Sequence, residues 1–133
     1  MALEDEVYPA LAQGVQGTAH RVLVGLNWTL VEGPHGMGFC HTAPRGRNGC
    51  RDLPASGHYG GKRLYDLSQM TSSENPFERS IGFAAINAHY NRFDLGGQPI
   101  NGLDLVDPSG EKTVVVGRFP DLDTRLPRAM VIE

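Results

Sequence analysis

The spacing of hydrophobic residues at the start of the chain predicts a short helix. Leu3, Val7 and Leu11 recur every four residues, so they would share one side of a helix. Gly14 follows, and glycine is typical of helix ends. The first helix is therefore expected to end at Gly14.

From His20 onward the hydrophobic spacing becomes two, which is typical of extended chain. Apolar residues alternate along His20–Leu26, and Trp28 and Leu30 continue the extended run to Val31. Residues 33–36, Gly-Pro-His-Gly, form a turn signal, and residues 37–42 would be the returning strand. The pattern predicts a small antiparallel meander.

Residues 43–61 are rich in glycine and proline and follow neither period, which predicts a long loop. Leu64, Leu67 and Met70 then indicate a short helix.

The clearest helix start in the chain is at residue 75. Asn75 is a favoured N-cap, Pro76 suits the first helical position, and Glu78 stands where the acid of a capping box reaches back. This helix is expected to run to about Arg92, before two consecutive glycines.

The predicted helix is apolar over most of its surface, which is typical of a buried helix. A narrow polar line interrupts the apolar surface, formed by Ser80, Asn87 and Asn91, while Gly82 and His89 are placed on an opposite, wetter face together with Glu78. Polar groups within a buried surface need partners. These three side chains are expected either to bind a ligand or to bond neighbouring backbone carbonyls.

The end of the chain predicts two strands of a parallel sheet. Residues 113–117, Thr-Val-Val-Val-Gly, form a continuous β-branched run of the kind found in strands covered on both faces. A short helix at 121–126 and a second strand at 129–133 would follow. Two parallel strands with one short crossover cannot cover both faces of a sheet. Further sequence or another chain would complete the sheet, or the strands pair elsewhere, and we favour further sequence.

Charge and hydropathy exclude several classes of protein. A net charge of −3 argues against nucleic-acid binding, which requires a concentrated basic surface. No apolar run is long enough to span a membrane, and the acidic N-terminus is unlike a signal peptide. A cytoplasmic protein is expected, in which a disulfide between Cys40 and Cys50 is neither required nor excluded.

Histidine and cysteine side chains offer a second hypothesis, a site for a divalent transition metal. The candidate ligands are His35, Cys40 and His41, with Cys50 and His58 nearby in sequence. Their spacing matches no compact zinc motif, and adjacent residues of a strand point to opposite faces. A buried Cys40 with histidines on surface loops is the alternative interpretation.

Two segments resemble a known family. Residues 80–91, Ser-Ile-Gly-Phe-Ala-Ala-Ile-Asn-Ala-His-Tyr-Asn, resemble the signature helix of the putative heavy-metal chelation family. Residues 115–120, Val-Val-Gly-Arg-Phe-Pro, resemble its opening Rossmann strand and Gly-His-Phe-Pro turn, and residues 130–133 resemble the next strand, which commonly ends in an acid. Arg118 stands where the family has histidine, so the acid–base or ligand role of that histidine is not carried over.

The resemblance implies an α+β fold: an enolase N-terminal-like antiparallel meander with helices over residues 1–110, followed by the start of a Rossmann-like parallel sheet over 111–133. It also implies a ligand- or metal-handling domain whose site lies at the interface with a second domain or partner. An enzyme acting on a small anionic or metal-chelating molecule, and an assembly module, are the alternatives. The uncovered sheet leads us to expect a homo-oligomer. The ligand-binding residues are expected to be Ser80, Asn87, Asn91, Gly117, Arg118, Phe119 and Glu133.

Overall fold

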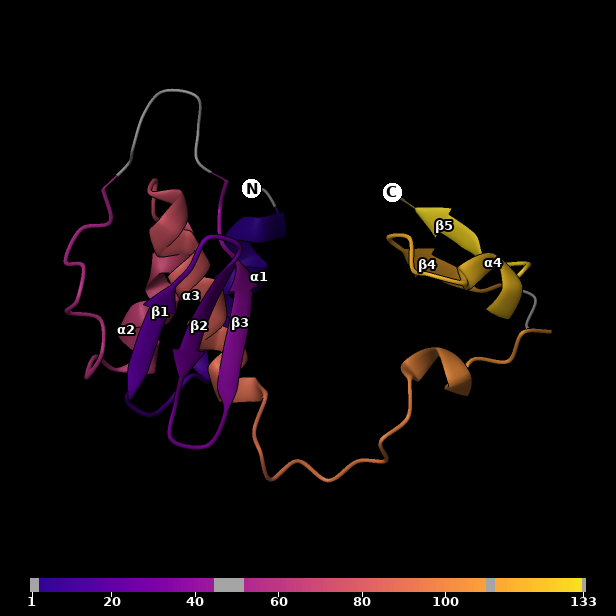
Figure 1. Ribbon diagram of the computed structural model, residues 1–133, viewed down its shortest axis with the longest axis horizontal. Coiled ribbons are helices and arrows are strands. Elements are labelled where there is room, and N and C mark those ends of the chain that lie inside the picture. The colour runs from indigo at the N-terminus through magenta and orange to yellow at the C-terminus, as the bar shows by residue number, and fades with distance from the viewer. Residues whose placement is uncertain (1–2, 45–51, 110–111, 133) are drawn as a thin grey trace. The chain divides into compact units, whose positions relative to one another are not determined.

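A computed structural model describes residues 3–44, 52–109 and 112–132 of the chain. The chain divides into two compact units, Met1–Leu95 and Gly96–Glu133 (Figure 1). A boundary at residue 110 between an enolase-like and a Rossmann-like part stays a prediction. No helix within the described ranges is both long enough and apolar enough to cross a membrane.

The first unit is a three-stranded antiparallel sheet with helices packed on one face (Figure 1). The strands follow one another in the order β1-β2-β3, and α3 packs on β2 and β3. The elements in chain order are α1 (Leu3–Gln13), β1 (Arg21–Val24), β2 (Trp28–Glu32), β3 (Met37–His41), α2 (Leu64–Ser68), the 3-10 helix η1 (Gln69–Ser72) and α3 (Pro76–Tyr90).

The prediction of one continuous extended run from His20 to Val31 was wrong, because this segment forms two strands, β1 and β2. The chain reverses between β1 and β2, where the Gly25 N–H donates to the Trp28 carbonyl at 2.9 Å. Thr29 and Val31 are fully buried against the helices, whereas the Trp28 side chain lies on the exposed face of the sheet. Leu23 and Phe39 join Trp28 there in an exposed apolar surface.

The start of α3 confirms the predicted cap with one difference. The Asn75 side chain accepts a hydrogen bond from the Phe77 N–H at 3.0 Å, and Pro76 is the first helical residue. The Asn75 N–H, however, donates to the Ser73 hydroxyl rather than to Glu78. That hydroxyl in turn donates to the Glu78 carboxylate at 2.5 Å, so Ser73 bridges the two ends of the expected capping box.

The core of this unit lies where α3 meets the sheet and η1, and glycines set how closely they approach. A Cβ on Gly38 of β3 would lie 2.0 Å from the Ala84 carbonyl oxygen of α3. Gly82, predicted on the wetter face, is buried, and a Cβ there would lie 2.5 Å from the Thr71 nitrogen of η1. The placement of Gly82 was wrong because η1 covers that side of α3.

The second unit contains the two predicted parallel strands. It consists of the 3-10 helix η2 (Gly102–Leu105), β4 (Val114–Val116), α4 (Leu122–Arg125) and β5 (Met130–Ile132). Val115 is buried with Leu122 and Leu126, while the flanking Val114 and Val116 are exposed. Within the described ranges, therefore, only one face of this small sheet is covered.

Candidate functional site

The polar line of α3 meets the edge of β3. The Asn87 side-chain amide donates to the Phe39 carbonyl at 2.7 Å. The Ser80 hydroxyl accepts from the Ala43 N–H at 3.3 Å, and its one proton can go to either of two carbonyls at 3.1 Å, that of His41 or that of Pro76 in α3 itself. Both side chains thus make the backbone contacts of the structural interpretation, and a ligand role for them stays a prediction.

The geometry of β3 explains why polar side chains are needed there. The Thr42 N–H donates to the Asn27 carbonyl. In an antiparallel pair, the backbone N–H and C=O groups of Thr42 and of every second residue before it therefore point toward β2. Phe39 and His41 alternate with these residues, so their carbonyls point away from β2, at the edge of the sheet. An outward carbonyl needs a partner or water. Asn87 supplies the partner for Phe39, and Ser80 lies within hydrogen-bond distance of His41.

Asn91, the third residue of the line, ends α3. It is the C-cap, and its backbone N–H donates to the Asn87 carbonyl at 2.8 Å. The residue is exposed, so its side-chain amide is open to water.

The three expected metal ligands lie in different surroundings. Cys40 is half-buried, and this burial raises the pKa of its thiol, which a hydrogen bond with Ser80 partly opposes. His41 is exposed, with its ring 5.7 Å from that of Trp28. His35 lines a cavity of about 310 Å³ together with His89 and Arg92.

No group of three or more histidine, cysteine or acidic side chains among residues 3–44, 52–109 and 112–132 is arranged to hold a metal ion. Cys50 and Glu133 lie outside the described residues. The metal site stays a prediction. His89 was expected only on a wet helix face, and no local pattern pairs it with His35, which lies in the turn between β2 and β3.

The turn after β4 contains the other expected ligand residues. Gly117 ends the strand with φ of +85°, a conformation that favours glycine, and its N–H donates to the Ile132 carbonyl of β5 at 2.8 Å. Arg118 forms an exposed ion pair with Asp123 at 2.8 Å. Phe119 is half-exposed, and Asp121 closes the turn with φ of +59°.

This turn borders an open cavity of about 580 Å³ lined by residues 118–124. The structure therefore brings Arg118 and Phe119 together at one opening, as expected from their adjacency. Asp123, which was not among the expected ligand residues, also lines this cavity. The sequence signal that could have identified Asp123 is an acidic residue in the short helix that follows the turn containing Arg118.

Comparison with known proteins gives one family and a fold. The family model described as "Putative heavy-metal chelation" matches residues 9–90. A protein of unknown function from the DUF364 family of Desulfitobacterium hafniense DCB-2 has a similar structure, with a TM-score of 0.72 and 23% sequence identity. The similarity covers 95% of this chain and 56% of that one.

A second structure, also of unknown function and from the DUF364 family, comes from Pyrococcus horikoshii. It has a TM-score of 0.53 and 22% identity, and the match covers 95% of this chain and 52% of that one. The chain thus spans about half the length of both solved proteins, and likeness at this identity shows the fold alone. No curated protein matches the chain.

Proposed function

We propose, because the chain belongs to the putative heavy-metal chelation family, that it is a ligand- or metal-handling domain whose site is completed by a second domain or a partner. The observation that carries this proposal is the open turn at the carboxyl end of β4. In open parallel sheets, ligands bind outside the carboxyl ends of the strands. The segment Gly117–Phe119 occupies that position in the second unit.

The turn has the features of a ligand loop. Two of its residues, Gly117 and Asp121, have left-handed backbone conformations, and for a non-glycine residue this is uncommon. Such conformations cluster at ligand-binding positions, where the surrounding structure maintains them. The adjoining cavity of about 580 Å³ falls in the size range of small-molecule sites.

Arg118 determines which ligands fit. A guanidinium repels a bare metal cation but donates paired hydrogen bonds to carboxylates. Its bond to Asp123 is exposed and therefore exchanges easily with a ligand carboxylate. We therefore infer that the site takes a metal as an anionic complex, or the chelating acid itself.

The test is an NMR-monitored titration of the chain with nickel–citrate, with citrate alone and with Ni²⁺ alone. Arg118→Ala should weaken binding of the two anions by about tenfold, the loss of roughly one charge-assisted pair. Arg128→Ala removes the same charge from an exposed position outside the turn and should leave binding unchanged. Equal effects of the two substitutions would refute the assignment. New product resonances from citrate would favour the enzyme alternative.

A second candidate, assembly, is favoured by the uncovered side of β4 and β5. The outward side chains are apolar and open: Val114 is 54% exposed, Val116 76%, Met130 65% and Ile132 51%. Faces of parallel sheets are normally covered, and contiguous apolar surface marks interaction sites. We infer that a second copy of the chain covers this face.

Light scattering after size exclusion tests the association. The unaltered chain should elute as an oligomer, and Val116→Lys should convert it to a monomer because a charge would be buried at the contact. Thr124→Lys adds the same charge at an exposed residue of α4 and should not. A monomer before any substitution would contradict the hypothesis.

A further inference from the structure

A further cavity lies within the first unit. It has a volume of about 580 Å³ and is bounded by α1, η1 and α3. Its apolar wall is formed by Ala12, which is almost fully buried, and by Phe83. The ring of Tyr8 meets Phe83 edge to face at 4.8 Å, so the two aromatic rings form one wall of the cavity.

The polar wall comes from η1. The hydroxyls of Thr71 and Ser72 each donate to a backbone carbonyl within the preceding turn, at 3.0 Å. Their protons are therefore used, and their oxygens can only accept from a ligand. The Gln69 amide makes one long hydrogen bond of 3.4 Å to Ser68, which leaves it a further donor and an acceptor.

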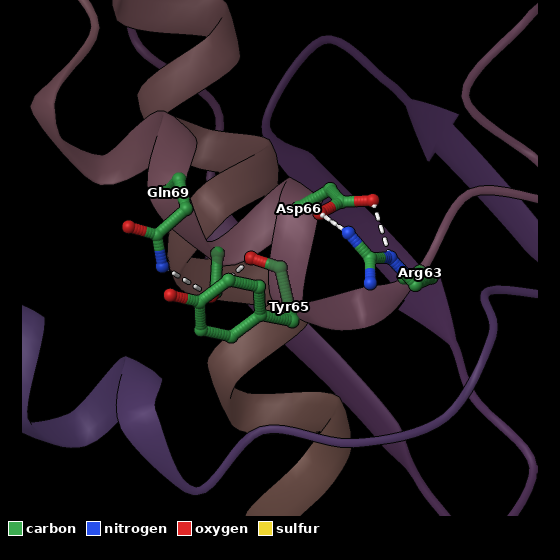
Figure 2. A network of polar contacts seen from close by, with 5 residues as sticks. Arg63, Tyr65, Asp66 and Gln69 are labelled. Carbon is green, nitrogen blue, oxygen red and sulfur yellow. Dashed lines mark hydrogen bonds and ion pairs between the residues drawn. The ribbon is translucent and has the colours of Figure 1, made fainter.

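The charge of the cavity comes from Arg79 on α3. Every other described arginine of the first unit is held by an acid. Arg63, for example, faces Asp66 with contacts of 2.8 and 2.6 Å, while Gln69 lies further along the helical segment (Figure 2). Arg79 is exposed and forms no ion pair with a described side chain.

The position of Arg79 within α3 adds to this charge. It lies in the first turns of the helix, where the helix dipole is also positive. The neighbouring acid, Glu78, accepts instead from Ser73 and Tyr59. Arg79 thus lines the cavity, and no hydrogen bond or ion pair among the described side chains uses its guanidinium.

We propose that this cavity binds a small organic carboxylate with an apolar, preferably aromatic, body. The guanidinium would hold the carboxylate by two parallel hydrogen bonds, and the aromatic wall of Tyr8 and Phe83 would hold the body. Gln69 would add a donor to a second ligand oxygen. The competing interpretation is a solvated arginine beside a surface hollow, and it predicts no preference for the charged ligand.

The probe is benzoate, with benzamide as its uncharged counterpart of the same shape, followed by amide chemical shifts of the labelled chain. Benzoate should shift amides of η1 and of Arg79–Phe83 and saturate in the millimolar range, whereas benzamide should bind about tenfold more weakly. Arg79→Gln should remove this difference. Arg21→Gln, which takes the same charge from an exposed ion pair on the sheet, should not.

Four results would overturn the proposal, and the first three concern where and how tightly the probes bind. They are shifts confined to other regions, equal binding of benzoate and benzamide, and equal effects of the two arginine substitutions. Absence of any shift up to about 10 mM benzoate would also overturn it, because even weak fragments bind a formed site at that concentration. Because the same spectra report whether each variant is folded, loss of structure is distinguished from loss of binding.

Discussion

Replacing Gly38 by alanine should disrupt the packing of β3 on α3 more than any surface change. An added Cβ would lie 2.0 Å from the Ala84 oxygen, 2.2 Å from the Ala88 nitrogen and 2.7 Å from the Asn87 carbonyl carbon. All three atoms belong to the backbone of α3, so no side-chain rotation can relieve the contact. The strand and the helix would have to move apart.

The size of that movement sets the energetic cost. Ordinary contact begins at 3.4 Å, so the distance from the new Cβ to the Ala84 oxygen must grow from 2.0 Å by about 1.4 Å. A gap of 0.5–1 Å already loses roughly a quarter to a half of the dispersion energy across a contact. Overpacking a core lowers the free energy of unfolding by about 1–3 kcal/mol. Because the clash here is with backbone atoms of α3, we expect Gly38→Ala to cost about 3 kcal/mol.

Urea and thermal unfolding followed by tryptophan fluorescence measure this loss. Trp28 is the only tryptophan and lies in β2, so its signal reports the first unit. A loss of about 3 kcal/mol would lower the midpoint temperature by roughly 12–24 °C in a domain of this size. Gly60→Ala is the control, because its Cβ would lie 3.5 Å from the His20 oxygen, an ordinary contact.

Both substitutions reduce the entropy of the unfolded chain equally, so their difference isolates the clash. A Gly38→Ala protein within about 1 kcal/mol of the Gly60→Ala protein would show that β3 and α3 are not in close contact.

Three further predictions concern single groups. Burial raises the pKa of the Cys40 thiol, so alkylation by iodoacetamide in a Cys50→Ser background should show a pH midpoint above 9.0; a midpoint below it would contradict the burial. The hydrogen bonds from Arg92 lower the pKa of Asp94 to about 2, so its stabilising contribution should decrease as the pH falls below about 3.9, the pKa in the unfolded chain, and be lost below about 2. Arg92→Gln should return the carbon-13 NMR midpoint of Asp94 toward about 3.9. Asn87→Leu should leave the chain folded but lower the free energy of urea unfolding by about 1 kcal/mol, because the Phe39 carbonyl loses its donor. An unchanged urea midpoint would show that this hydrogen bond contributes nothing to stability. Loss of nickel–citrate binding would reveal a ligand role for Asn87 as well.

The sequence predicted the elements whose signals are local. The cap at Asn75, the proline after it and the β-branched runs near the end of the chain each act through the backbone of their own segment. The reversal at Gly25 was missed because apolar residues continue through Leu26 and Trp28, although both side chains are exposed. The hydropathy pattern cannot distinguish an apolar residue that faces water from one that is buried.

The candidate sites show the same division between local and distant signals. Gly117 and Arg118 could be selected because the family motif that they resemble is contiguous in sequence. The cavity of Tyr8 and Arg79 could not be predicted, since α1 and α3 meet only through tertiary packing. Gly82 was misplaced for a related reason, because glycine carries no hydropathy signal and its burial depends on η1.

The contacts of Ser80 and Asn87 also limit how copies of this chain could associate through their sheets. These side chains occupy two outward carbonyls of β3, so another strand cannot readily add at that edge. Within the described residues, β1 is the opposite edge of the three-stranded sheet. Strand addition to this three-stranded sheet would therefore join one β1 to another across a two-fold axis, and such a contact closes after two molecules instead of propagating into a fibre.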